Sequence, residues 1–105
     1  MTAIAIGTDL QSNGKLVLDK KARETHVHVI GASGTGKSYF LEQMIRRDIS
    51  RGSGVCFIDP HGETYNNLVA WLATSGISAR SVHLINPSRG EFSVGFNPLC
   101  LEDSN

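Results

Sequence analysis

A glycine-rich segment at residues 31–38, GASGTGKS, carries the most specific chemistry in this sequence. It matches the phosphate-binding pattern G-x-x-x-x-G-K-S in full. Glycines let successive amide N–H groups turn inward toward phosphate oxygens, and the following helix adds its unpaired N-terminal amides. Lys37 supplies a mobile positive charge for the β- and γ-phosphates, and Ser38 offers a hydroxyl to Mg²⁺. The predicted nucleotide-binding residues are Gly31, Ala32, Ser33, Gly34, Thr35, Gly36, Lys37, Ser38 and Tyr39.

A second polar segment, DPHGE at residues 59–63, follows the next apolar run and contains two carboxylates and an imidazole. Ligands bind at the carboxyl ends of parallel strands, so we expect Asp59 to face the phosphates and hold an Mg²⁺-bound water. Glu63 would then orient an attacking water, and His61 would sense the γ-phosphate. The alternative is that Asp59 and Glu63 only cap the next helix, because acids favour helix N-termini without any catalysis.

The predicted catalytic residues are therefore Lys37, Asp59 and Glu63, and the predicted metal ligands are Ser38 and Asp59. Two amphipathic helices would position them. Apolar residues recur at helical spacing through residues 40–49 and again through 65–72. Gly52 is expected to end the first helix and Gly76 the second.

Strand-like runs complete the predicted fold. Runs at 4–6 and 16–18 flank Asn13 and Gly14, which tolerate the positive φ angles of a type I′ turn, so a β-hairpin is expected. Apolar runs at 26–30, 55–58 and 82–85 alternate with the two helices, which predicts a parallel sheet with right-handed crossovers. We therefore expect an α/β fold in one domain, 1–105, with a hairpin lead-in at 1–24 and a β-α-β-α-β nucleotide-binding core at 25–105.

Composition sets broad limits. The 105 residues contain 10 basic and 10 acidic side chains, so net charge favours no class of partner. Cys56 and Cys100 have no metal-ligand spacing, which fits a reducing compartment, and Cys56 is expected to be buried in a strand. The sequence contains no apolar run of ~18 residues, so it is predicted to lack a membrane span.

Three segments, HVHVIGASGTGKS, VCFIDPHGE and GFNPL, resemble the HerA/FtsK superfamily of DNA-pumping ATPases. They are most similar to the conjugative coupling and type IV secretion ATPases, and they extend over residues 27–99. The resemblance implies a RecA-like fold, ATP with Mg²⁺, a ring of six subunits and DNA in the central channel. It implies that Gly36, Lys37 and Ser38 bind the nucleotide and that Asp59 and Glu63 lie near the γ-phosphate.

Members of this superfamily also have a later apolar strand ending in an acidic pair, which supplies the main Mg²⁺-coordinating and catalytic acids. No such strand follows here, so we expect the chain to be the N-terminal part of a longer cytoplasmic ATPase motor domain. We expect that protein to contact the inner face of a membrane only through parts outside this chain. The isolated chain is expected to hydrolyse ATP negligibly. In a ring, Arg23 would be a candidate arginine finger for a neighbouring subunit.

Two other functions remain open from the residues. The first is a P-loop kinase or another NTPase that moves no polymer, although no arginine-rich lid or acceptor pocket is evident. The second is a nucleotide-sensing module without turnover, although Asp59 and Glu63 weigh against it. The arginines at 46, 47 and 51 fit a solvated face near a helix C-terminus, and Trp71 fits packing better than base stacking.

Overall fold

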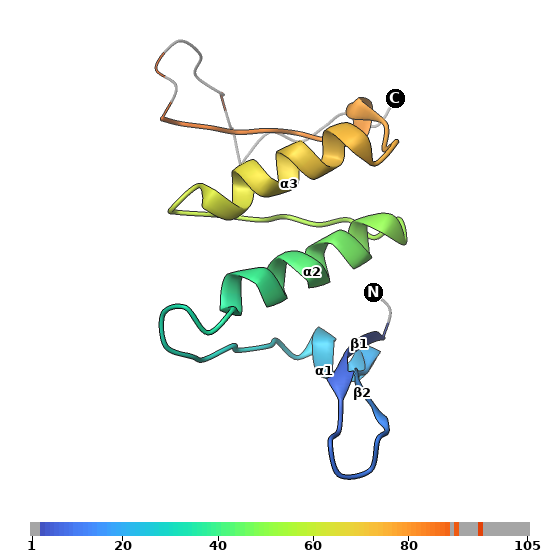
Figure 1. The fold of residues 1–105 in the computed structure, drawn as a ribbon. Coiled ribbons are helices and arrows are strands. Elements are labelled where there is room, and N and C mark those ends of the chain that lie inside the picture. The colour runs from blue at the N-terminus through green and yellow to red at the C-terminus, as the bar shows by residue number, and fades with distance from the viewer. Residues whose placement is uncertain (1–2, 89, 91–94, 96–105) are drawn as a thin grey trace. The chain divides into compact units, whose positions relative to one another are not determined.

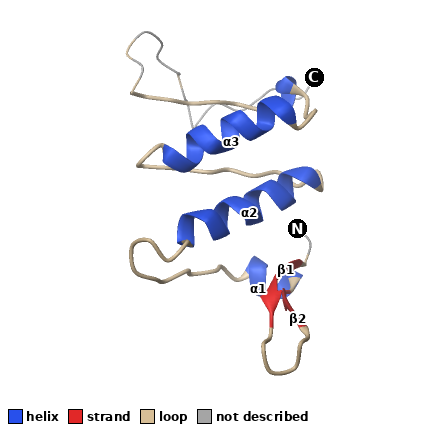
Figure 2. Ribbon diagram, in the orientation of Figure 1, coloured by secondary structure: helices blue, strands red, loops and turns tan. Residues whose placement is uncertain are grey.

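The computed structural model describes residues 3–88, 90 and 95. The chain divides into two compact units, Met1–Ser75 and Gly76–Asn105. The first contains strands β1 (Ile4–Thr8) and β2 (Lys15–Leu18) and helices α1 (Lys20–Glu24), α2 (Lys37–Ser50) and α3 (Glu63–Thr74) (Figure 1). The second contains the 3₁₀ turn Ala79–Ser81. The described chain is therefore a small α/β structure with one antiparallel hairpin and several helices (Figure 2).

The predicted hairpin is confirmed, but its turn differs from the expected type. The connection begins where the Asp9 amide donates to the Gly14 carbonyl at 2.8 Å. The Asp9 carboxylate accepts from the Gln11 amide at 3.0 Å and from the Ser12 hydroxyl at 2.5 Å. Asn13 has a φ of 55°, whereas Gly14 is outside the left-handed region, so the prediction of a type I′ turn is wrong. The Asp9 side chain organises a longer loop instead.

Both predicted long helices are confirmed. Beyond α2, Gly52 takes a φ of 76°, and beyond α3, Gly76 takes a φ of 73°, which are backbone angles that glycine adopts without strain. The helices pack on each other, and the Arg46 guanidinium carbon lies 5.3 Å from the centre of the Trp71 ring. These residues lie in the C-terminal half of α2 and of α3, so the helices run in the same direction (Figure 1).

A short helix, α1, was not anticipated from the sequence. Asp19 precedes it, and its carboxylate accepts a hydrogen bond from the Ala22 amide at 2.7 Å. This is the capping role in which aspartate is preferred. Only one turn forms, so no apolar periodicity revealed it.

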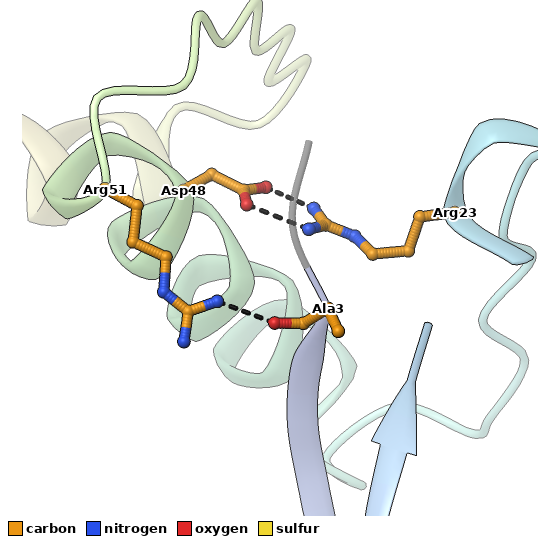
Figure 3. A network of polar contacts seen from close by, with 4 residues as sticks. All are labelled: Ala3, Arg23, Asp48 and Arg51. Atoms are coloured by element: carbon orange, nitrogen blue, oxygen red, sulfur yellow. Dashed lines mark hydrogen bonds and ion pairs between the residues drawn. The ribbon is translucent and has the colours of Figure 1, made fainter. Parts of the chain in front are cut away.

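A set of arginine contacts, which we call the arginine clamp, joins β1 and α1 to the last turns of α2 (Figure 3). Arg23 of α1 makes a two-pronged ion pair with Asp48 of α2, with Nη1 to Oδ1 at 3.0 Å. Arg51 donates to the Ala3 carbonyl at 2.6 Å, and Arg47 donates to the carbonyl of Ala5. Arg47 and Arg51 are exposed, as expected for a solvated face, but they also bond to Ala5 of β1 and to Ala3 just before it.

The packed centre of the first unit is small. Ile4, which pairs with Leu18 across the hairpin, is fully buried, and Leu68 of α3 is 6% exposed. Glu42 of α2 is also buried and pairs with Arg46 one turn later. Arg46 therefore links the buried Glu42 of its own helix to the Trp71 ring of α3. This supports the expected packing role of Trp71.

The segments expected to be parallel strands, 26–30, 55–58 and 82–85, are not assigned as strands in the described structure. Parallel strands depend on hydrogen-bonded neighbours and on layers covering both faces. Here Ile30 is 82% exposed and Ile58 is 84% exposed. Cys56 is exposed as well, so its predicted burial is wrong. The residues Asn97, Pro98 and Leu99 of the GFNPL segment lie outside the described residues.

Candidate nucleotide-binding site

Two glycines of the loop adopt backbone angles that side chains disfavour. Gly34 has a φ of 79°, and Gly36, which immediately precedes α2, has a φ of 89° and a ψ of 16°. A residue with a Cβ loses roughly 1–2 kcal/mol in this left-handed region. These two positions therefore explain why the turn into α2 contains glycine.

Gly31 is required for a different reason, which is close packing. A Cβ at this position would lie 2.7 Å from Thr35 Oγ1 and 3.3 Å from Lys37 Cγ. Thr35 is itself fixed, because its hydroxyl donates to the Ala32 carbonyl at 2.6 Å and its amide donates to the same oxygen at 3.3 Å. The loop thus closes on the Ala32 carbonyl. Sequence reasoning placed Thr35 in the loop but missed this bracing role.

Lys37, the first residue of α2, folds back over the loop. Its ammonium group donates to the Ala32 carbonyl at 2.8 Å. This bond is charge-assisted through its donor alone, and a phosphate oxygen would add the attraction between two opposite charges. The lysine is therefore held beside the loop in a position from which a phosphate oxygen can replace the carbonyl.

The N-terminus of α2 is open, whereas that of α3 is occupied. Both helices follow a glycine in the left-handed region, Gly36 or Gly62. The first turn of α2 has neither a side-chain cap nor an acidic residue. In α3, the Asp59 carboxylate accepts from the Tyr65 amide at 2.9 Å, and Glu63 lies in the first turn. Only α2 therefore leaves its first amides available to an external anion.

Asp59 is embedded in backbone hydrogen bonds. One carboxylate oxygen accepts from Tyr65, and the other accepts from the His61 amide at 3.0 Å. The Tyr65 amide contributes most to lowering the pKa of Asp59, burial opposes it, and the amides of Gly62, His61 and Thr64 lower it further. Asp59 therefore stays ionised and closes the loop before α3. This geometry is that of the helix-cap alternative, and a role at the phosphates stays a prediction.

The two candidate segments lie at the same end of a helix pair. Because α2 and α3 run in the same direction, the loop before α2 and residues 59–62 before α3 both lie at the N-terminal end of the pair (Figure 1). The side chains of Ser38, Tyr39, His61 and Glu63 are exposed there. Among the described residues, no three His, Cys, Asp or Glu side chains cluster as a metal site.

Arg23 lies elsewhere. Its residue exposure is 9%, and its guanidinium is engaged by Asp48. An arginine finger has to reach the transition state of a neighbouring active site. Arg23 is therefore engaged within its own chain, and a role as an arginine finger for a neighbouring subunit stays a prediction.

One family model matches nearly the whole chain. Its description is "Helicase HerA, central domain", and the match covers residues 4–104. It includes the hairpin, the glycine-rich loop and both long helices. A search of curated proteins and a search of solved structures each returned no match. In the described part of the chain, no helix combines the length and apolar character needed to span a membrane.

Proposed function

We propose, from the premise that this chain belongs to the HerA central-domain family, that it is the ATP-binding part of a DNA-translocating motor. Family membership indicates an ATPase motor of the HerA/FtsK type. The observation that carries the proposal for this chain is a complete phosphate-binding loop followed by a helix with an open N-terminus. That combination is a ready-made site for an anionic ligand.

ATP would bind through the loop and the first turn of α2. The amides of residues 34–39 would surround the phosphates, since neither a side-chain cap nor an acidic side chain occupies this helix start. Lys37 would exchange the Ala32 carbonyl for the β- and γ-phosphate oxygens. Thr35 would keep its bonds to Ala32, so the loop would not need to reform.

The residues present fit Mg²⁺, the ion implied by the resemblance. Mg²⁺ uses one or two protein oxygen ligands together with substrate phosphates and water. The hydroxyl of Ser38 in the first turn of α2 would hold it, and no hydrogen bond engages that hydroxyl within the described residues. When bound, the ion neutralises charge on the transferred phosphoryl group. Asp59 would hydrogen-bond the water shell of the ion through the carboxylate that the amides before α3 hold in place.

The segment before α3 would serve hydrolysis. Glu63, with an exposed side chain at the first position of α3, would orient the attacking water. His61 would sense the γ-phosphate. The hydrogen bond that its backbone amide donates to Asp59 would hold His61 in position in the loop. The parallel direction of α2 and α3 supports this assignment, because it puts both segments at one end of the pair.

We also propose how the sheet is completed and how subunits assemble. Segments 26–30, 55–58 and 82–85 would become parallel strands of a RecA-like sheet once neighbouring strands cover them. The exposed Ile30 and Ile58 support this, because they are apolar surface that such neighbours would bury. We further propose a ring of six subunits with DNA in its channel, in a conjugative coupling or type IV secretion ATPase. Sequence resemblance supports these finer assignments.

The test is ATP hydrolysis by the full-length protein with and without DNA. Asp59→Asn is expected to lower turnover by at least about tenfold, because misplacing a catalytic water or proton acceptor costs that much or more. Its affinity for ATP should change little, since the phosphates are held by the loop. If DNA does not stimulate hydrolysis, the proposal of a DNA-translocating motor is contradicted, even if the protein binds ATP.

Asp19→Asn is the matched control, because Asp19 also caps a helix through a backbone amide but lies before α1. Because asparagine caps helices about as well as aspartate, this control separates the loss of a capping residue's charge from the loss of a catalytic group. If turnover falls equally in Asp19→Asn and Asp59→Asn, or falls only with the folded fraction, Asp59 is a helix cap alone.

A further inference from the structure

Tyr39 is an exposed aromatic residue at the entrance to α2. It directly follows Lys37 and Ser38 and is the third residue of the helix. Its exposure is 68%, whereas Phe57 is 36% exposed, and the other described aromatic side chains are less exposed than Tyr39. No hydrogen bond engages its hydroxyl among the described residues. Packing within the first unit therefore gives no reason for an aromatic ring at this position.

Helix geometry determines where this ring can reach. Side chains of an α-helix lean toward its N-terminus, so a residue in the first turn leans over the preceding loop. Successive residues are about 100° apart around the axis, which separates Lys37 from Tyr39 by roughly 200°. The two side chains thus leave α2 on nearly opposite sides, both beside the glycine-rich loop.

A bound triphosphate would run between them. Lys37 takes the β- and γ-phosphates, and the amides of the loop take the α- and β-phosphates. The α-phosphate and the attached nucleoside then leave the loop on the side away from Lys37. Tyr39 is the aromatic side chain that α2 presents on that side at its first turn.

We propose that the Tyr39 ring is the stacking surface for the base of the bound nucleotide. This inference rests on the proposed function, because it needs a triphosphate in the loop. Every base has a π-face, so stacking contributes affinity without reading the base edges. Tyr39 thus adds affinity for a nucleoside triphosphate over inorganic phosphate chains.

The test compares two probes, ATP with Mg²⁺ and inorganic tripolyphosphate with Mg²⁺, by calorimetric titration of the protein. Tyr39→Ala is expected to weaken ATP binding on the order of tenfold, the scale of one lost base stack. Tripolyphosphate binding should stay within about twofold, as for a neutral surface substitution. Tyr39→Phe should retain ATP affinity, because the ring is kept and the hydroxyl has no role.

Leu10→Ala is the control, since Leu10 is 98% exposed and lies in the hairpin loop. It should change neither affinity. Circular dichroism checks that α2 still forms, and Tyr39→Leu replaces Tyr39→Ala if the alanine variant does not fold.

Equal losses for ATP and tripolyphosphate would overturn the inference, because the substitution would then act on the loop. Unchanged ATP affinity in Tyr39→Ala would also overturn it and leave the proposed function intact. If the unmodified protein binds neither probe, the proposed function fails together with the inference.

Discussion

The ion pair between Arg23 and Asp48 should dominate the stability of the arginine clamp. The Arg23 side chain is 5% exposed and that of Asp48 is 13% exposed, and both guanidinium nitrogens of the fork reach the carboxylate. Arg23→Met removes the charge and keeps much of the apolar stem. It leaves the Asp48 carboxylate, which is mostly shielded from solvent, without its partner.

The expected loss follows from that burial. Removing one partner of a buried pair costs about 3–5 kcal/mol, and the remaining exposure of Asp48 places this case near about 3 kcal/mol. A domain of this size has a total stability of only about 5–15 kcal/mol, so the effect should be large. In Arg23→Met/Asp48→Leu no buried charge is left alone, so most of the loss should be recovered.

The assay is urea denaturation followed by circular dichroism and by the fluorescence of Trp71, the single tryptophan. Lys20→Met on the same helix is the matched control. Its ion pair with Glu24 spans 3.6 Å between side chains that are 65% and 55% exposed, so its loss should stay within about 0.5 kcal/mol. The clamp reasoning is refuted if Arg23→Met loses no more stability than Lys20→Met. It is also refuted if Arg23→Met/Asp48→Leu loses as much stability as Arg23→Met and Asp48→Leu lose in sum when made separately.

Two further perturbations test the two helix starts. The folded-state pKa of Asp59 is lowered, so the stability that its capping bonds provide should be present above the ordinary carboxyl pKa of 3.8 and lost as the pH falls below it. An acid titration of helix content should therefore show a steeper loss in the unmodified protein than in Asp59→Asn, and identical curves would argue against this role. Gly36→Ala should destabilise the protein by about 1–2 kcal/mol because of its positive φ. Gly54→Ala, which meets open space at an ordinary φ, should cost less, and equal losses would count against backbone strain.

Local patterns in the sequence predicted much of this fold. Helical spacing and the glycines at 52 and 76 located α2 and α3, and Asn13 with Gly14 located the hairpin. These features depend on neighbours in the sequence, and their signals are correspondingly local. The cap of α1 had a local signal as well, since Asp19 is a favoured capping residue, but one turn shows no periodicity.

Long-range contacts were not predictable in this way. Arg51 bonds to Ala3 and Arg47 to Ala5, across more than forty positions of the chain. Nothing in the local pattern shows that these exposed arginines also bond to a distant strand. The segments predicted to be parallel strands are not strands in the described structure for a related reason, because a strand is stable only with the partners that cover it.

The candidate site was partly predictable. The glycine-rich motif identified the loop, and the structure adds how Ala32, Thr35 and Lys37 brace one another. The sequence left two roles open for Asp59, at the phosphates or at a helix cap. Its bonds to His61 and Tyr65 establish the capping contact, and the catalytic role stays a prediction.

Titration of ATP with Mg²⁺ into the protein and into Lys37→Ala tests the central claim most directly. A hydrogen bond to a charged group contributes about 1.5–3 kcal/mol, so Lys37→Ala should bind at least about tenfold more weakly. Lys15→Ala, at an exposed lysine in β2, is the control and should bind as the unmodified protein does. Binding of ATP by the unmodified protein, with a loss confined to Lys37→Ala, is the result we predict. Equal affinities for the unmodified protein and Lys37→Ala would contradict the assignment of this loop as the nucleotide-binding site.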